Sequence, residues 1–324
     1  MSLEREILKE LAPTVDSYLK NPTWDNRAWN PGKIMNFMES DDRERQLALF
    51  REHANSVTDP ALVIATGFAV TERGLPNYSA RAGHLVGDGT GVSKDPWSRF
   101  FRRWNAEEEE HGAILYRYLF LSGRIDMEAF DYSAFHLIEN GWVQNPDDIY
   151  HALFYPMVQE QIAQIGYIKL ARLVADKDPL LAGICKKIAG DESRHAAFYK
   201  TIGKALFSSR RRDEALIHFD SFMDKVLNMP SRLMDDRIEG EPPTLYEKFT
   251  NVSISSGVFA GPDYADILEG LNKDLGVIDF ATKDEELERI KKRLIELPNR
   301  FRKVAKRRAE HTPVPFDWIY GRVA

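Results

Sequence analysis

Hydrophobic residues recur at helical spacing along almost the whole of this chain, and this pattern predicts an all-α protein. The first predicted helix covers residues 3–20 and ends at Asn21-Pro22, because proline interrupts helical hydrogen bonding. A loop rich in Trp, Asn and Pro follows, and a second helix is predicted from about Ser40 to Ser56. Two helices and a long loop are therefore expected ahead of the main body of the chain.

Four later helices are predicted to share one start signal, which is Asp or Asn followed at once by Pro. Asp and Asn are favoured N-caps, and Pro suits the first helical position because its missing N–H would have no partner there. The four signals are Asp59-Pro60, Asp95-Pro96, Asn145-Pro146 and Asp178-Pro179. They indicate four helix origins of similar construction.

Each of these predicted helices carries one glutamate at nearly the same distance from its start. Glu72, Glu108, Glu160 and Glu192 follow their prolines by 12 to 14 residues. That separation corresponds to roughly 18–21 Å along a helix. Helices of about 25 residues would place all four glutamates near mid-helix, where the members of an antiparallel bundle meet whichever way each one runs.

Two of the four glutamates are followed three residues later by a histidine. On a helix, residues three apart share a face, so the carboxylate and the imidazole can bind one metal ion. Each half of the pattern therefore provides a helix with one glutamate and then a helix with Glu-x-x-His. Four-helix di-iron and di-manganese carboxylate proteins use this ligand inventory. It predicts six metal ligands: Glu72, Glu108, His111, Glu160, Glu192 and His195.

A third acid-x-x-His pair, Asp148 and His151, is interpreted differently. Roughly one such pair is expected by chance in a chain with this many acidic residues. Asp148 follows Asn145-Pro146 so closely that it falls in the first helical turn, where an acidic side chain offsets the helix dipole. We therefore assign this pair a structural role.

The residues around Glu72 and Glu160 indicate that both carboxylates are buried. The run 61–70 before Glu72 is apolar on all sides, which is not typical of a surface helix. Buried carboxylates are normally neutralised, paired or bound to metal, and four of them would nearly balance two divalent ions. Pro76 and Pro156, four residues from Glu72 and Glu160, are expected inside helices, where they would kink the axis.

Glu107 and Asp191 each stand immediately before a predicted ligand glutamate, at matching positions in the two halves. Metal-bound histidines are usually oriented through their second ring nitrogen. We therefore hypothesise that each of these acids accepts a hydrogen bond from the histidine of the opposite half. Nitrogen and oxygen ligands without thiolate suit iron or manganese better than structural zinc.

Composition and charge exclude several classes of function. The chain is 43% hydrophobic and 29% charged, as in ordinary globular proteins. A net charge of −6 and a pI near 5.8 argue against general nucleic-acid binding. Cys185 is the single cysteine, so no internal disulfide framework is expected. Neither a secretory signal nor an apolar run of the ~18–20 residues that span a membrane is visible, and we expect a cytoplasmic protein.

We expect a single domain over 1–324, because no low-complexity linker interrupts the chain. The metal-binding bundle is predicted to cover about 59–208, between an N-terminal segment, 1–58, and C-terminal helices with a tail, 209–324. A helix at about 126–139 is expected to bridge the two halves of the bundle. The other predicted elements are a helix that follows the basic run 210–212 and extends to about Met229, a mostly irregular stretch over 236–262 with a short helix near Tyr246, helices near 263–275 and 283–308, and an extended aromatic tail over 313–320.

Several motifs closely resemble those of the soluble acyl-(acyl-carrier-protein) desaturases. They occur in the order of that family from about Trp29 to the C-terminus. The matching motifs are Trp104-Asn105-Ala106-Glu107-Glu108-x-x-His111-Gly112 with residues 118–127 after it, Thr71-Glu72-x-x-Leu75-Pro76-x-Tyr78, Gln159-Glu160, Asp191-Glu192-x-Arg194-His195 and Pro315-Phe316-x-Trp318-Ile319.

The resemblance implies a homodimeric, ferritin-like helical enzyme with two iron ions in a four-helix bundle. Members of this family use oxygen and electrons from ferredoxin to remove two hydrogens from a saturated acyl chain on acyl carrier protein. The family's ligand pattern falls on the six residues predicted above. A Trp-x-Pro motif at Trp29 implies an electron route through Trp29, Asp191 and His111; a core aromatic is the alternative interpretation of Trp29.

One residue departs from the plant members of the family. They have a threonine, thought to help protonate bound oxygen, three residues after the third-helix glutamate, and this chain has Ala163. This difference keeps open a di-iron hydroxylase or N-oxygenase acting on a carrier-bound substrate. A third interpretation is a ferritin-like iron-binding oxidase without an organic substrate. The predicted bridging helix and C-terminal helices argue against it, because an iron-storage bundle needs little beyond four helices. The absence of a plastid transit peptide indicates a bacterial-type protein.

Acyl carrier protein is strongly acidic, so its docking requires a local basic patch on this acidic chain. The candidate patches are Arg99 with Arg102 and Arg103, the run Arg210–Arg212, and Lys303 to Arg308.

The length of the acyl substrate and the position of its double bond depend on a pocket that the sequence does not reveal.

Overall fold

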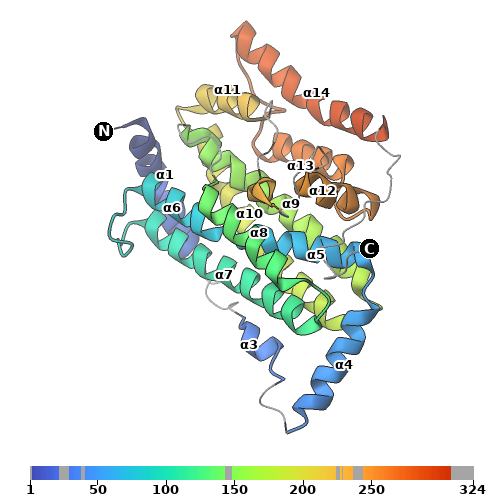
Figure 1. The fold of residues 1–324 in the computed structure, drawn as a ribbon. Coiled ribbons are helices and arrows are strands. Elements are labelled where there is room, and N and C mark those ends of the chain that lie inside the picture. Colours follow the sequence, from blue (N-terminus) through green and yellow to red (C-terminus); the bar gives the residue numbers. More distant parts are fainter. Residues whose placement is uncertain are drawn as a thin grey trace.

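The computed structural model describes residues 2–21, 29–37, 41–142, 148–223, 227, 229–235 and 244–307, with side chains up to 304. All regular elements in these ranges are helices, so the predicted all-α class is confirmed (Figure 1). In chain order they are α1 (Leu3–Leu19), α3 (Pro31–Ile34), α4 (Arg43–Ser56), α5 (Asp59–Glu72), α6 (Leu75–Val86), α7 (Pro96–Ser122), α8 (Met127–Asn140), α9 (Ile149–Val174), α10 (Pro179–Phe207), α11 (Arg212–Met223), the 3-10 helix η1 (Pro230–Leu233), α12 (Leu245–Ser255), α13 (Gly261–Asp274) and α14 (Glu285–Arg307).

Four helices, α5, α7, α9 and α10, form the central bundle. The α9 and α10 helices pack along each other, α5 packs on both α7 and α9, and α7 also packs on α10. In Figure 1, α11, α13 and α14 lie on the α9 side of this bundle, whereas α3 and α4 lie on the α7 side. The bundle is thus covered by both the N-terminal and the C-terminal segments of the chain.

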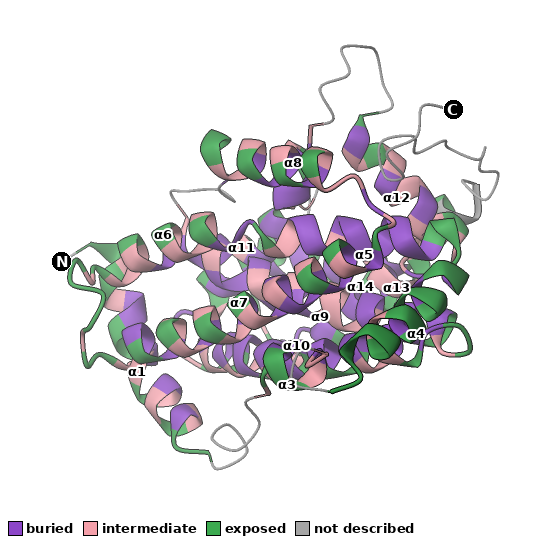
Figure 2. Ribbon diagram, turned by 60° about the horizontal axis from the view of Figure 1, so that its bottom comes forward, coloured by how far each residue is buried: buried purple, intermediate pink, exposed green. Residues whose placement is uncertain are grey.

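Burial follows the same arrangement. Figure 2 shows α5 as mostly buried and α4 as largely exposed. The run 61–67 of α5 is buried without interruption, as its apolar sequence predicts. Gly67 permits a close approach from α12, because a Cβ at this position would lie 2.9 Å from the ring of Phe249. The α5 helix is therefore enclosed between the other bundle helices and α12.

The helix start signals behave differently at the four positions. Asp95 and Asp178 are N-caps whose side chains accept hydrogen bonds from backbone N–H groups of α7 and α10. At α5 the predicted cap is wrong by one residue. Thr58 is the N-cap and Asp59 is already helical, with its carboxylate 2.9 Å from the Arg124 guanidinium. The Asp59 carboxylate instead pairs with a cation from the connection between α7 and α8.

The start of α9 corrects another prediction. Asn145-Pro146 lie outside the described residues, and the helix begins at Ile149. Asp148 is its N-cap and accepts hydrogen bonds from the backbone N–H groups of Tyr150 (2.9 Å) and His151 (3.2 Å). Asp148 therefore stands before the first turn rather than within it.

Three of the four glutamates lie near mid-helix as predicted, in α7, α9 and α10 with 27, 26 and 29 residues. For Glu72 the prediction is wrong, because α5 has 14 residues and ends at Glu72. The chain turns at Arg73 and Gly74, and Pro76 stands in the first turn of α6 rather than inside a helix. A proline has no N–H to contribute to a continuous helix, so α5 and α6 form as two helices. Pro156 does lie inside α9.

Boundaries outside the bundle shift by a few residues. The described part of α11 ends at Met223, and Leu227 and Met229 are not helical, so the helix stops before 229; η1 begins at Pro230. The short helix expected near Tyr246 extends over α12, and α13 begins at Gly261. Trp24, the Glu239–Pro243 stretch and the tail 313–320 lie outside the described residues. Among the helices that the structure describes, none combines the length and apolar character needed to cross a membrane.

The Asp178 cap provides a test of how the bundle is held together. This side chain is 0% exposed, accepts from Leu181 N (2.9 Å) and also accepts from the Tyr118 hydroxyl (2.7 Å). Asp178→Ala removes a helix cap that contributes about 1 kcal/mol to stability. It also leaves the buried Tyr118 hydroxyl without its acceptor, which costs about 1–3 kcal/mol. We expect the free energy of unfolding, measured by urea denaturation, to fall by about 3 kcal/mol. Asp95→Ala, an exposed cap, is the control at about 1 kcal/mol, and equal losses would contradict this account.

Candidate metal centre

Six side chains from the four bundle helices converge in the bundle core. They form two overlapping groups, and within each group the possible ligand atoms lie within 4.8 Å of one another. The first group is Glu72, Glu108, His111 and Glu192, and the second is Glu108, Glu160, Glu192 and His195. The structure therefore brings together all six residues that the sequence proposes as ligands.

Glu108 and Glu192 belong to both groups, and each presents one oxygen to each histidine. Glu108 Oε2 lies 3.2 Å from His111 Nδ1, and its Oε1 lies 2.8 Å from His195 Nδ1. Glu192 Oε1 lies 3.5 Å from His111 Nδ1, and its Oε2 lies 3.4 Å from His195 Nδ1. The two carboxylates thus connect the two halves of the site.

The second nitrogen of each histidine contacts an acid from the opposite half. His111 Nε2 lies 3.1 Å from Asp191 Oδ2, and His195 Nε2 lies 3.0 Å from Glu107 Oε2. This pairing is the one hypothesised from the sequence. Arg194 joins the two pairs, since its guanidinium lies 2.6 Å from Asp191 Oδ1 and 3.3 Å from Glu107 Oε2.

Trp29 reaches the site from the segment before α3. Its indole N–H donates to Asp191 Oδ2 at 2.7 Å, and its ring lies nearly parallel to that of His111, with centroids 6.1 Å apart. Trp29 is half-buried, so these contacts connect the site with the protein exterior.

Two aromatic residues for which no contact with the ligands was predicted contact the remaining carboxylates. The Trp104 indole N–H donates to Glu160 Oε1 at 3.2 Å, and the Tyr167 hydroxyl donates to Glu72 Oε1 at 2.5 Å. Trp104 lies four residues before Glu108, and Tyr167 seven after Glu160, so each shares a helix face with a predicted ligand. That spacing is the signal by which they could have been found.

Burial and mutual repulsion determine the charge of the carboxyl groups. Burial, reinforced by the charge of Glu108, raises the pKa of Glu72 to about 8. The pKa of Glu192 is raised well above its usual value by burial and by the charges of Glu108 and Glu160. Burial also opposes ionisation of Glu108, but His111 and the second histidine outweigh it and lower that pKa.

The histidines show the opposite balance. Burial alone would lower the pKa of His111, yet Glu108, Asp191 and Glu192 hold it well above the usual value. His195 behaves in the same way beside Glu107 and Glu108. Protons on the imidazoles and on some carboxyls therefore offset the buried negative charge, and a metal ion bound here has to displace them.

A mainly apolar cavity of about 480 Å³ opens beside Glu72. Its wall near the site is formed by Thr71, Glu72 and Ala163, and α12 and α13 enclose its other side. Ala163 therefore faces this cavity, where its methyl group offers no hydrogen-bond donor.

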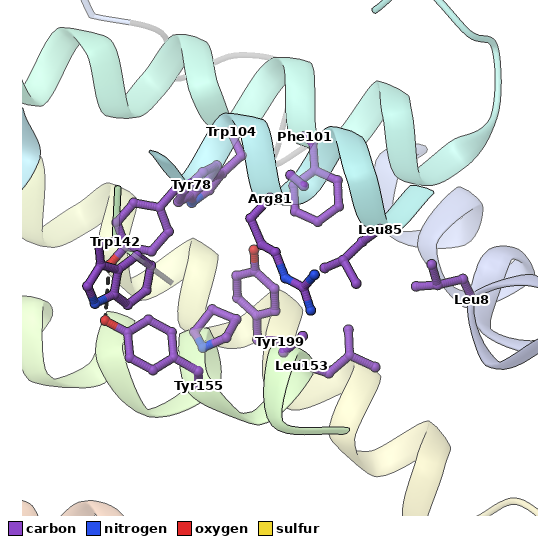
Figure 3. Close-up of a pocket in the computed structure, with 13 residues that line it drawn as sticks. Leu8, Tyr78, Arg81, Leu85, Phe101, Trp104, Trp142, Leu153, Tyr155 and Tyr199 are labelled. Carbon is purple, nitrogen blue, oxygen red and sulfur yellow. Dashed lines mark hydrogen bonds between the residues drawn. The ribbon is translucent and has the colours of Figure 1, made fainter. Parts of the chain in front are cut away.

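A smaller pocket of about 60 Å³ lies at the other side of the site, between α6, α7 and α9. Trp104 lines it, so the pocket is separated from Glu160 by one indole ring. Figure 3 shows Arg81 extending into this pocket among aromatic and aliphatic side chains, with the Tyr78 and Tyr155 hydroxyls joined at 3.0 Å.

Comparison with known proteins gives the family. A family model described as fatty acid desaturase matches residues 3–320. The chain is 35% identical to stearoyl-[acyl-carrier-protein] 9-desaturase 5 of Arabidopsis thaliana, over 98% of this chain and 82% of that protein. It is 34% identical to an acyl-[acyl-carrier-protein] 6-desaturase of Thunbergia alata, over 91% of this chain and 77% of that protein. This chain belongs to the fatty acid desaturase family.

The desaturase match covers all six candidate ligands, and it confirms the resemblance that the motifs indicate. The fold agrees with the X-ray structure of DesA2 from Mycobacterium tuberculosis H37Rv, which is proposed to be an acyl-ACP desaturase. The TM-score is 0.56 at 18% identity, over 88% of this chain and 99% of that one. This likeness supports the arrangement of helices.

The contacts of Asp191 and Glu107 lead to a prediction about metal affinity. Replacing either residue with alanine frees the outer nitrogen of a candidate ligand histidine, so we expect metal binding to weaken by about tenfold. Equilibrium dialysis of the purified variants against Fe²⁺, with metal content determined by mass spectrometry, measures this change. Glu109→Ala on the exposed face of α7 is the control and should bind metal as the wild type does. Wild-type iron content in both Asp191→Ala and Glu107→Ala would rule out the positioning role.

Proposed function

We propose that this chain catalyses the oxygen-dependent desaturation of a saturated fatty acyl chain carried on acyl carrier protein. The observation that carries this proposal is a cluster of four carboxylates and two imidazoles, all buried except the half-buried Glu72, beside an apolar cavity. The cluster provides ligands for two metal ions, and the cavity suits a methylene chain. The desaturases of carrier-bound acyl chains among the relatives supply the substrate class.

The ligand atoms fit two iron ions. Glu108 and Glu192 are buried, and their oxygens lie 2.8 to 3.5 Å from the Nδ1 atoms of the two histidines, so a cation can take the place of the protons between them. The donor set contains oxygen and nitrogen and no thiolate, as iron and manganese prefer. The proposed ligands are Glu72, Glu108, His111, Glu160, Glu192 and His195. When bound, iron would supply the activation of oxygen that removal of hydrogen from an alkyl chain requires.

The protein's own groups position this ligand set. Glu108 and Glu192 face both histidines, so each could supply ligand oxygens to either half of the site. Asp191 and Glu107 fix the orientation of the histidines, and Arg194 offsets the negative charge of these two acids. The surrounding buried side chains exclude water from the reacting atoms.

The cavity beside Glu72 is the proposed site of the acyl chain. Its walls are mainly apolar, and each buried methylene contributes about 0.8 kcal/mol to binding. An acyl chain lying in this cavity passes Glu72 and Ala163, which places its carbon atoms next to the proposed metal ligands. Specificity for chain length would depend on how far the chain can extend beyond this point.

We also propose ferredoxin as the electron donor and a homodimer as the assembly, both on the basis of the family resemblance. Trp29, with its contacts to Asp191 and His111, is the proposed electron entry. The Ala163 side chain favours a second candidate function, hydroxylation of a carrier-bound substrate, because the cavity wall lacks a hydroxyl at this position.

The contacts of the basic residues narrow the proposed docking surface for acyl carrier protein. Arg210 and Arg211 each lie 2.8 Å from Glu6, and Arg211 is also 2.9 Å from Glu10, so the charge of this run is largely offset within the chain. Arg99 lies 3.2 Å from Asp16 and Arg103 3.3 Å from Glu107, so the patch at the start of α7 is offset in the same way. We therefore propose the third candidate patch, Lys303 to Arg308, as the docking surface; Lys303 is exposed near the end of α14.

The reaction itself is tested with the intact mass of acyl carrier protein that carries a saturated acyl chain. The carrier is incubated with iron-loaded enzyme, ferredoxin, reductant and oxygen. Loss of two hydrogens is the expected result. Gain of an oxygen atom would replace desaturation with hydroxylation, whereas reductant consumption without any change in mass would reject both reactions on this substrate.

Ala163→Thr tests the effect of the missing hydroxyl. One added hydrogen bond of about 0.5–1.5 kcal/mol should raise the ratio of product formed to oxygen consumed by roughly two- to tenfold. Ala163→Val adds the same volume without a donor and serves as the matched control. If valine and threonine change the ratio equally, cavity shape rather than the hydroxyl controls coupling.

A further inference from the structure

A second group of metal-ligating side chains lies at the start of α9, outside the candidate metal centre. It consists of Asp148, His151 and His218, whose possible ligand atoms lie within 4.8 Å of one another. Asp148 and His151 repeat the acid-x-x-His spacing of the central site, and His218 comes from α11. His151 lies nine residues before Glu160, which is roughly 13–14 Å along the helix, so the two groups of residues are separate.

The two oxygens of Asp148 serve different groups. Oδ1 accepts the backbone N–H groups that begin α9. Oδ2 lies 2.9 Å from His218 Nδ1 and 3.4 Å from His151 Nε2. One carboxylate oxygen therefore faces two imidazole nitrogens while the helix cap is maintained.

The two separations from Asp148 Oδ2 are close to those between ligand atoms in a tetrahedral metal site. Bonds of about 2.0 Å to nitrogen and oxygen place neighbouring ligand atoms about 3.3 Å apart. The observed separations of 2.9 and 3.4 Å lie on either side of this value. We propose that Asp148, His151 and His218 form a binding site for a divalent transition-metal ion of the zinc class, with water as the fourth ligand.

Aromatic packing holds both rings in place. His151 is 1% exposed, and its ring lies edge-on to Phe222, with centroids 5.6 Å apart. His218 stacks on Tyr150 at 4.4 Å, and its side chain is 37% exposed. One ligand is thus fixed in the interior and the other lies at the surface, where water can complete the coordination shell.

The surrounding charges are compatible with a bound cation. Tyr150, which stacks on His218, also interacts with the cation Arg211. Arg211 is paired with Glu10 at 2.9 Å and with Glu214 at 3.3 Å. The Tyr150 hydroxyl donates to the same Glu214 carboxylate at 2.6 Å. Carboxylates therefore offset the arginine charge, and Asp148 remains to balance the metal ion. A bound ion would clamp α11 to the first turn of α9.

Zinc binding to the iron-loaded protein tests this proposal. The protein is dialysed against micromolar Zn²⁺, and zinc and iron are both determined by mass spectrometry. We expect one zinc per chain with no loss of iron, and a rise in Tm on zinc addition. His218→Ala should bind zinc at least tenfold more weakly and lose the Tm rise, whereas His53→Ala, an exposed histidine on α4, should behave as the wild type.

Asp148→Asn separates the metal ligand from the helix cap. Its side-chain oxygen can still cap α9, but the charge is lost, so zinc affinity should fall by about tenfold while the fold is retained. The proposal is overturned if the wild type binds no zinc, if His218→Ala binds as much zinc as the wild type, or if each zinc bound displaces an iron. Any of these results would leave the group as a hydrogen-bonded link between α9 and α11.

Discussion

Burial of four carboxylates in an apolar bundle is the constraint on which the rest of this structure depends. Such groups cannot remain charged in the interior without nearby positive charge. In the protein without metal, that charge comes from protons, and this explains why the pKa values of His111 and His195 are raised despite complete burial. Metal ions take the place of these protons, so metal affinity and the protonation of the site are linked.

The layer around the ligands answers the same constraint. Each histidine contacts an acid of the opposite half, and these two acids share a single guanidinium from Arg194. Outward from the proposed metal ions, neutral imidazoles are therefore followed by negatively charged acids and then by the positively charged arginine. Trp104 and Tyr167 complete the layer by donating to the two carboxylates that do not face both histidines.

The sequence predicted the bundle and the six converging residues because these depend on spacing within single helices, which repeats in both halves. It missed contacts that depend on distant parts of the chain. Arg211 is separated by 201 residues from Glu10, its partner, and no local pattern indicates that pair. Tyr167 resembles an ordinary core aromatic until the structure places its hydroxyl next to Glu72. The end of α5 was missed because Pro76 was expected to kink one continuous helix, whereas Gly74 and Pro76 together mark a break between two helices.

That break makes the two halves of the site mechanically unequal. Glu160 lies within an unbroken helix, held by hydrogen bonds on both sides, whereas Glu72 is the last residue of α5, where the backbone has fewer such restraints. Glu72 also borders the large cavity, while Trp104 screens Glu160 from the small one. Of the six converging side chains, Glu72 is therefore the one at which a molecule in the cavity directly meets the ligand set, and the Tyr167 hydroxyl is what restrains its carboxylate where the helix no longer does.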